Sequence, residues 1–254
     1  MDKRGFLTVM AALFCMIVIA QPDSAKMTPE SSELWNPVPR IVTPSMAAVT
    51  NAASTAPSDA IVLFDGKDFS KWKSSVANSS VQWTIADGAM TVKPGTKDIE
   101  TVQQFDDYQL HIEFRTPAEV KGTSQGRGNS GIFMQGKYEL QVLDNYDNKT
   151  YSNGQAGSIY KQSMPLVNAC KKPGEWQSYD IVYTSPKFNK DGMVTHPAYI
   201  TVLQNSIVVQ NHTPIYGTTP YIGQPQYEVH GKGPIRLQDH NNRTSFRNIW
   251  IREL

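Results

Sequence analysis

The stretch GNSGIFMQGKYELQVLD, residues 128–144, contains two runs in which side chains alternate in character, separated by a Gly-Lys turn. Alternation with a period of two is typical of a β-strand with one face in a core, so the stretch predicts a β-hairpin. In the second run Leu140 and Val142 occupy one face, whereas Glu139 and Gln141 occupy the other. This strand must therefore present a carboxyl and an amide on a polar surface.

Similar strand patterns, separated by turn signals, follow one another from Ile61 to the end of the chain. The segment VQWTIADGAMTV, residues 81–92, predicts a hairpin with Asp87 and Gly88 at its turn. No segment has the period of about 3.6 of a long amphipathic helix, and no repeat of fixed length is present. We therefore predict an all-β fold, an antiparallel β-sandwich or jelly roll.

The composition favours some partners over others. The 254-residue chain has 24 basic and 23 acidic residues, so its charge gives no indication of a nucleic-acid or anionic-membrane partner. Its 11 Tyr and 5 Trp residues suit β-strands and surfaces that stack on sugar rings. The composition therefore permits a protein whose partner is a small carbohydrate molecule, but it does not by itself identify one.

The first 25 residues have the layout of a secretory signal peptide. Lys3 and Arg4 precede the apolar run Phe6–Ala20, and alanines at positions 20 and 25 offer small residues for cleavage. The run is shorter than the ~20 residues that a membrane helix needs, so we expect no stable membrane span. A periplasmic or secreted protein is expected.

Residues 26–59 are rich in Ser, Thr, Ala and Pro and lack periodicity, which indicates a linker. Its segment ELWNPVPRIV, residues 33–42, could instead pack against the following domain or lead to the rim of an active site. Residues 60–254 then form one jelly-roll domain. Without the signal peptide Cys170 is the single cysteine, so we expect a buried or half-buried thiol and no intrachain disulfide.

Six segments together resemble the 3-keto-disaccharide hydrolase family, also described as 3-keto-glucoside lyase and hydratase. They occur in the family's order and span residues 61–254: IVLFDGKDFSKW, WTIADGAMTV, GNSGIFMQGKYELQVLD, GSIY, GEWQSYDIVY and GPIRLQDHNNRTSFRNIWIREL. The resemblance implies a concanavalin A-like jelly roll, a curved sheet whose concave face binds sugar, and a bacterial protein outside the cytoplasm. Glu139 and Gln141 would then face the sugar groove.

Glucanases of the same fold carry the acidic pattern Glu-x-Asp-x-x-Glu on this kind of strand. The chain has Glu139, Gln141 and Asp144 at those positions, so an amide replaces the middle carboxylate. A retaining glycosidase needs two carboxyl groups ~5 Å apart, so the replacement disfavours the ordinary two-carboxylate mechanism. Strand alternation also places Asp144 on the opposite face of the strand from Glu139, unless the strand bulges or ends before Asp144. Glu139 could also be a purely structural, ion-paired groove residue.

The chemistry that the resemblance implies starts with removal of the C2 proton next to a C3 ketone. It needs a general base, a group that stabilises the enolate oxygen, and an acid for the leaving group. The candidate catalytic residues are Glu139, His111, Glu113 and His240. Strand alternation places His111 and Glu113 on one face, which is either the groove face or a solvated charge ladder.

The candidate substrate-binding residues are charged, amide or phenol side chains on the presumed groove strands and loops. They are Arg127, Gln141, Arg236, Gln238, Asp144 and Tyr160. Arg127 lies in a Gly-rich loop from which it could close on substrate, or it is a surface loop arginine. Arg236 could bind sugar or pair with Glu139. A divalent cation could polarise the keto oxygen, but no close ligand cluster indicates one, so the metal requirement is open.

The resemblance implies an exported enzyme that cleaves 3-keto-glucosides by C2 proton abstraction, elimination and hydration. Net hydrolysis of the glycosidic bond results. Two alternatives remain: a conventional glycoside hydrolase of the glucanase type, and a sugar-binding module without turnover. The fold alone does not separate these functions.

Overall fold

A computed structural model describes residues 27–39, 41 and 56–254. These residues form an almost entirely β-structure, and the helices among them are short 3-10 turns: η2 (Pro29–Ser32), η4 (Ser124–Gly126) and η5 (Ser152–Gly154). The strands are β1 (Ile61–Phe64), β2 (Trp72–Ser74), β3 (Thr84–Ala86), β4 (Ala89–Thr91), β5 (Ile99–Thr101), β6 (Tyr108–Arg115), β7 (Ser130–Met134), β8 (Tyr138–Val142), β9 (Gln177–Thr184), β10 (Lys187–Phe188), β11 (Val194–His196), β12 (Ala198–Gln204), β13 (Ile207–Ile215), β14 (Arg236–Leu237) and β15 (Ser245–Glu253).

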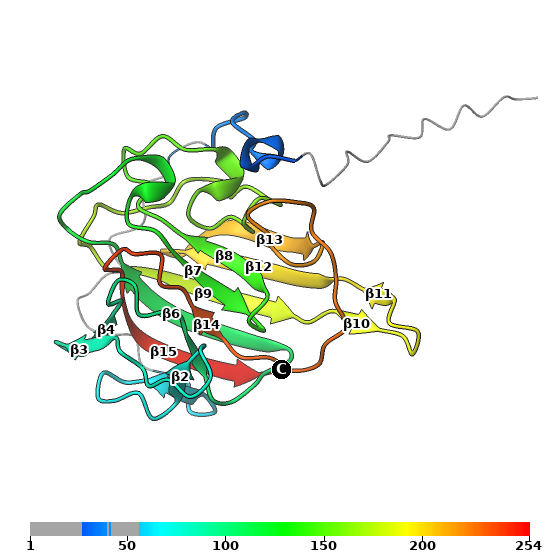
Figure 1. Ribbon diagram of the computed structural model, residues 1–254, viewed down its shortest axis with the longest axis horizontal. Helices are drawn as coiled ribbons and strands as arrows, with labels where there is room; N and C mark the ends of the chain where they lie inside the picture. Colours follow the sequence, from blue (N-terminus) through cyan, green and yellow to red (C-terminus); the bar gives the residue numbers. More distant parts are fainter. Residues whose placement is uncertain (1–26, 40, 42–55) are drawn as a thin grey trace, which may run out of the picture.

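Two sheets make up the molecule (Figure 1). The larger has the order β13-β12-β9-β6-β15-β4-β3, with β1 also paired to β15, and the smaller has the order β2-β5-β14-β7-β8. Neighbouring strands in both sheets are antiparallel. A separate ribbon is formed by β10 and β11. The predicted all-β antiparallel sandwich of the jelly-roll type is therefore confirmed.

The core lies between the two sheets, and the alternation of each strand determines which side chains enter it. On β6 the apolar members Leu110 and Ile112 are fully buried, and on β8 Leu140 and Val142 are fully buried. All four belong to one core cluster. Burial of each such side chain stabilises the fold by about 1.5–3 kcal/mol. The opposite face of β8 is therefore free to carry polar groups.

The turns that join the strands use the residues that their backbone geometry requires. Asp87 and Gly88 have φ angles of 50° and 72°, which match the tight turn of the β3–β4 hairpin. Asn205 has a φ angle of 52° in the turn between β12 and β13. The hairpins expected over residues 81–92 and 128–144 are both present, as β3–β4 and β7–β8. Cys170 is a buried free thiol, and burial raises its pKa to about 11.

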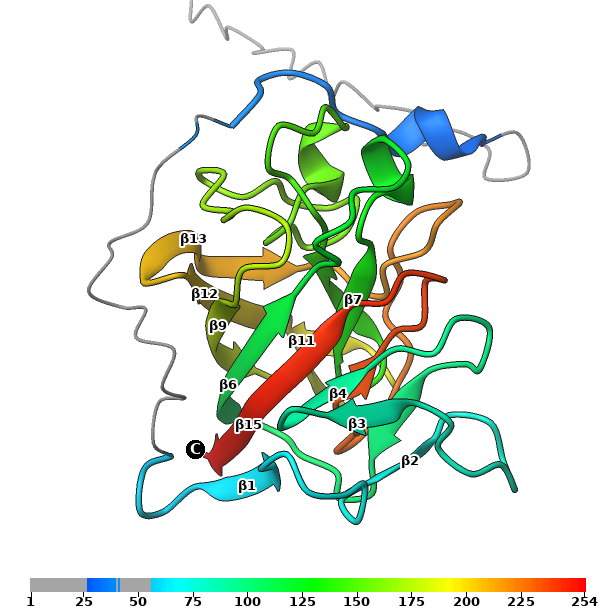
Figure 2. The same cartoon turned by 90° about the vertical axis from the view of Figure 1, so that its left-hand side faces the viewer.

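The segment of residues 27–39, which we call the strap, lies over the end of the sandwich where the loops containing η4 and η5 are found (Figures 1 and 2). Residues 33–39 thus pack against the domain, which was the alternative to a linker for the segment 33–42. The expected signal peptide, and the linker residues 42–55, lie outside the described part of the chain. Within the described part, no helix has the length and apolar character to cross a membrane.

Candidate active site

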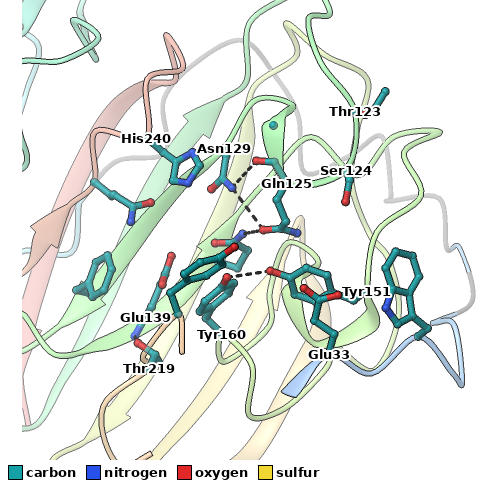
Figure 3. Close-up of a pocket in the computed structure, with 16 residues that line it drawn as sticks. Glu33, Thr123, Ser124, Gln125, Asn129, Glu139, Tyr151, Tyr160, Thr219 and His240 are labelled. Carbon is teal, nitrogen blue, oxygen red and sulfur yellow. Dashed lines mark hydrogen bonds between the residues drawn. The ribbon is translucent and has the colours of Figure 1, made fainter. Parts of the chain in front are cut away.

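A pocket of about 680 Å³ opens over the outer face of the smaller sheet, next to the strap (Figure 3). Its wall combines one central carboxyl with amides, hydroxyls and aromatic rings. The lining residues are Glu33, Trp35, Thr123, Ser124, Gln125, Gly126, Asn129, Phe133, Glu139, Gln141, Tyr151, Tyr160, Thr219, Tyr221, Gln238 and His240. A concave site with a few converging polar groups is the usual form of a small-molecule site.

Glu139 and Gln141 both line this pocket, as the alternation of β8 predicts. The backbone N–H of Glu139 donates to Thr219 Oγ1 at 3.1 Å, and its side chain is only 6 % exposed. Gly131 on the neighbouring strand β7 leaves room for the carboxyl. A Cβ atom at that glycine would lie 2.5 Å from Glu139 Oε1, closer than two atoms can pack. The glycine therefore makes space for the carboxyl.

Burial raises the pKa of Glu139 to about 8, because removal from water disfavours the charged form. The positive charge of Arg236 opposes this shift, and the negative charge of Asp98 adds to it. Arg236 lies 4.3 Å from the centre of the Phe133 ring and 3.6 Å from Asp98 Oδ2. Glu139 therefore exchanges its proton close to neutral pH, which suits a general acid or base.

The amide of Gln141 lies beside Glu139. One end of this amide donates to Gln125 Oε1 at 2.8 Å, and Gln125 donates to the Gly154 carbonyl at 2.9 Å. The other end lies 3.0 Å from Glu139 Oε1 and 3.2 Å from the Ser130 carbonyl, so an amide that turns its NH₂ group to this side donates to both oxygens. Gln141 is therefore within hydrogen-bond range of the carboxyl.

Other groups complete the pocket around Glu139. Gln238 follows β14, and its Oε1 atom is buried without a hydrogen-bond partner within the described residues. His240 is exposed at the rim, on the side where Asn129 lies (Figure 3). Tyr160 is hydrogen-bonded to Tyr151 through their hydroxyls at 2.8 Å, and burial raises the pKa of Tyr160 to about 12. The pocket thus offers amide, hydroxyl and phenol groups around the Glu139 carboxyl, with His240 at its rim.

Two of the candidate catalytic residues, His111 and Glu113, do not line this pocket. They lie on β6 in the larger sheet, on the face away from the core, but both are buried there, so they belong neither to this pocket nor to a solvated charge ladder. His111 Nδ1 lies 2.6 Å from Asp180 Oδ1, and Glu113 Oε2 accepts from Arg247 at 2.6 Å. The structure therefore gives these two residues an ion-pair network in place of a position at the pocket.

The same network shifts both pKa values. Burial alone would lower the pKa of His111, but its hydrogen bonds to Asp180 and Glu113 outweigh burial and raise it to about 9. Burial would raise the pKa of Glu113, but hydrogen bonds from His111, Asn248 and Arg247 lower it to about 2. Both groups are therefore charged over the ordinary pH range, and a group with a fixed charge is a poor proton-transfer catalyst.

Arg127 and Asp144 contact each other beside the pocket. Arg127 Nε donates to Asp144 Oδ2 at 2.6 Å, and its other nitrogens donate to the carbonyls of Tyr146 and Asp147. Both residues line an adjacent cavity of about 540 Å³, which His240 also lines. Arg127 holds the loop after β8 in place, so its hydrogen bonds are committed to the protein and not directed at the main pocket.

Three pocket residues from loops, Gln125, Tyr151 and Tyr221, were not anticipated from the sequence. Glu33 and Trp35 come from the strap, for which the sequence left open a place at the rim of the site. Loops have no periodicity from which the direction of a side chain can be read. The signal for the strap was an acidic residue and a Trp inside a segment otherwise rich in small residues. Within the described ranges, no group of three or more His, Cys, Asp or Glu side chains is arranged to hold a metal ion.

The sequence matches the model of the 3-keto-alpha-glucoside-1,2-lyase-like domain over residues 59–252. The chain belongs to this family. The matched range includes Glu139, Gln238 and His240 but begins after the strap. None of the proteins with curated functions matches the sequence.

Solved structures of similar proteins agree with this assignment. A proposed glycosyl hydrolase from Parabacteroides distasonis ATCC 8503 is 55 % identical, with 89 % of this chain and 97 % of that chain covered and a TM-score of 0.77. A second proposed glycosyl hydrolase from the same strain is 21 % identical, with coverage of 77 % and 94 % and a TM-score of 0.56, and is similar in fold. The chain is thus a carbohydrate-active, hydrolase-type enzyme of this family.

Proposed function

We propose that the protein cleaves 3-keto-glucosides, including 3-keto-disaccharides, with Glu139 as the general base. The observation that supports this role most strongly is a buried carboxyl with a pKa of about 8 in a sugar-sized pocket. A C3 ketone makes the C2 proton acidic enough for such a base. The Gln141 amide lies 3.0 Å from Glu139 Oε1 and would help to hold the carboxyl in position.

The reaction has two balanced stages. Glu139 removes the proton from C2, and the electron pair of the C2–H bond forms an enolate with the C3 carbonyl. The enolate then restores the ketone and forms a C1=C2 double bond while the C1–O bond breaks, and the leaving oxygen takes up a proton. Water next adds across this double bond, with hydroxyl to C1 and a proton to C2. The sum of both stages is hydrolysis.

Other pocket residues have roles that follow from their chemistry. The Gln238 amide, which can donate from its NH₂ group, would stabilise the enolate oxygen. His240 is the exposed ionisable group on the rim, and it would supply the proton to the leaving oxygen. Arg236 would act through space by limiting the pKa rise of Glu139. Tyr160, with its pKa of about 12, would remain a phenol that donates to or accepts from sugar hydroxyls.

A conventional glycosidase is the second candidate, because a second carboxyl, Glu33, lines the same pocket. In that mechanism Glu139, protonated at neutral pH, would be the general acid, and Glu33 would activate water. A binding module without turnover is the third candidate. The three functions differ in which sugar is cleaved, a keto sugar alone, both sugars, or neither. One set of assays therefore separates them.

The test uses the purified protein with a 3-keto-glucoside and with its unoxidised parent, each with and without a chelator. Product formation and C2 deuterium exchange are followed by NMR. Cleavage of the keto sugar alone, accompanied by C2 exchange, supports the proposal. Equal cleavage of both sugars identifies a conventional glycosidase, and binding without turnover identifies a sugar-binding module. Loss of activity with the chelator would show that a divalent cation takes part.

A variant pair tests the role of the base. Glu139→Gln should lower kcat by about 10²–10⁴-fold, the usual range for loss of a general base. Glu175→Gln is the matched control, because Glu175 is exposed and does not line the pocket. An active Glu139→Gln variant would remove this residue from the mechanism.

We further propose that the protein acts in the periplasm or is secreted, on the basis of the signal-like residues 1–25. Mass spectrometry of protein from cell fractions would test this proposal. The expected result is a mature chain that begins near residue 26, found outside the cytoplasm. A full-length cytoplasmic chain would contradict it.

A further inference from the structure

The strap is fastened to the domain mainly through its own backbone. The Leu34 N–H donates to Asn153 Oδ1 at 3.1 Å, and Asn153 Nδ2 donates to the Ser32 carbonyl at 2.9 Å. Lys161 Nζ donates to the Pro29 carbonyl at 2.7 Å. Because these bonds use backbone atoms of the strap, they do not occupy the polar atoms of its side chains. The Glu33 carboxyl is therefore not used in these three bonds.

The pocket has two ends with different chemistry. Glu139 lies at one end, Glu33 and Tyr151 lie at the other, and Tyr160 lies between them (Figure 3). The volume of about 680 Å³ equals that of roughly 20 water molecules at ~30 Å³ each. That number is close to the count of non-hydrogen atoms in a disaccharide and well above that of one hexose. The pocket therefore has room for a second sugar ring at the strap end.

The strap end has the groups that a second sugar ring needs. Trp35 packs edge-on against Tyr151, with ring centroids 6.2 Å apart and an interplanar angle of 65°, and remains 45 % exposed. One side of the indole is thus held by protein while another part stays open for stacking on a sugar. Glu33 is half-buried at the same wall and can accept from sugar hydroxyls.

A loop on the far side of the strap end is tied to the strap by Lys161. Besides its bond to Pro29, Lys161 Nζ donates to the Tyr221 carbonyl at 2.9 Å and lies 4.7 Å from the centre of the Tyr221 ring. Tyr221 lines the pocket and is 61 % exposed. The Lys161 ammonium group therefore connects the strap, which carries Trp35, to the loop that carries Tyr221.

We propose that the strap forms a leaving-group subsite, in which Trp35 stacks on the second sugar of the substrate and Glu33 accepts its hydroxyls. This inference rests on the proposed function, because it assigns the reacting sugar to the Glu139 end. The family match begins at residue 59, so the subsite is built by a segment outside the matched domain. The strap would accordingly select substrates with a carbohydrate leaving group over those with a small one.

The test compares a 3-keto-disaccharide with the methyl 3-keto-glucoside in wild-type protein and in Trp35→Ala, Glu33→Gln and Leu34→Ala. Leu34 is the matched control, because it belongs to the strap and is 52 % exposed but does not line the pocket. Trp35→Ala and Glu33→Gln should each lower kcat/KM for the disaccharide about tenfold. The methyl glucoside should be unaffected, and Leu34→Ala should behave as wild type with both substrates.

Equal losses on both substrates would overturn the subsite. The subsite would also be overturned if Leu34→Ala lowered kcat/KM for the disaccharide as much as Trp35→Ala does. The effect would then come from the position of the strap and not from the indole. Abolished cleavage of both substrates by Glu33→Gln would make Glu33 a catalytic carboxyl instead.

A binding measurement separates failure of this inference from failure of the proposed function. Calorimetric titration with the unoxidised disaccharide and with methyl glucoside requires no turnover. Weaker disaccharide binding in Trp35→Ala, with no cleavage of any keto sugar, would retain the subsite and refute the proposed reaction. Cleavage of keto sugars with no change in disaccharide binding or selectivity would refute the subsite alone. Absence of both cleavage and binding would refute both.

Discussion

Replacement of Gly131 by alanine tests whether the position of the Glu139 carboxyl controls the reaction. The added Cβ would lie 2.5 Å from Glu139 Oε1, whereas ordinary contact begins at 3.4 Å, so the carboxyl must move by about 0.9 Å. A misplacement of ~1 Å at a reacting group can lower the rate about 100-fold, or about 2.7 kcal/mol in activation free energy. We therefore expect Gly131→Ala to lower kcat about 100-fold on a 3-keto-glucoside.

The fold should survive this change, because the atoms that the Cβ meets are the ends of the Glu139 and Phe133 side chains and not backbone. Gly126→Ala is the matched control. Gly126 lines the same pocket, but a Cβ there meets nothing within 4 Å. Circular dichroism melts of both variants would show whether a lost rate reflects unfolding.

A double-mutant cycle locates the effect. If Gly131→Ala acts by moving the carboxyl, then adding it to Glu139→Gln should cost little further activity. A Gly131→Ala variant that is as active as wild type would refute the role given to this carboxyl. An additive loss in the double variant would mean that the alanine disturbs some other part of the pocket.

Three further predictions concern pH. If Glu139 is the base, kcat/KM should rise with pH on the acid side of its pKa of about 8; a kcat/KM that is constant below that pH and falls only above it would show that Glu139 acts as an acid. Burial raises the pKa of Glu139 in the folded protein above its ordinary value of 4.5. The free energy of unfolding of the wild type should therefore fall as the pH rises from 4.5 toward about 8. Over this pH range, Glu139→Gln should melt at an increasingly higher temperature than the wild type. An unchanged difference in melting temperature would contradict the raised pKa. His111→Asn should leave kcat unchanged and lower the melting temperature. The loss of melting temperature should be largest below the ordinary histidine pKa of 6.5 and should decrease as the pH rises through about 9. A lower kcat in a variant that is still folded would return His111 to the mechanism.

The sandwich could be predicted because strand alternation is a local signal. The residues of β8 show this plainly, since Leu140 enters the core and Glu139 and Gln141 line the pocket. The turn at Asp87 was equally readable, because few residues tolerate its backbone angles. Both features depend only on residues that are close together in the sequence. The side of the strand on which a residue lies, and the residues that a tight turn accepts, can therefore be predicted locally.

Alternation did not reveal which outer face carries the site. His111 and Glu139 each lie on an outward face of a strand, but only Glu139 belongs to the sheet on which the pocket forms. That difference depends on which sheet the loops cover, and it is set by contacts between residues far apart in sequence. Bonds such as Leu34 to Asn153 have no local signature in the sequence. For the same reason, the sequence left the place of Glu33 and Trp35 open between a linker and the rim of the site.

The position of the strap affects how the protein should be prepared for study. Residue 59 is the natural start of a recombinant version according to the family match, yet such a version would lack Glu33 and Trp35. It would keep the core and Glu139. If the strap forms the proposed subsite, a screen with such a shortened protein would rank simple glucosides too highly and underrate disaccharides.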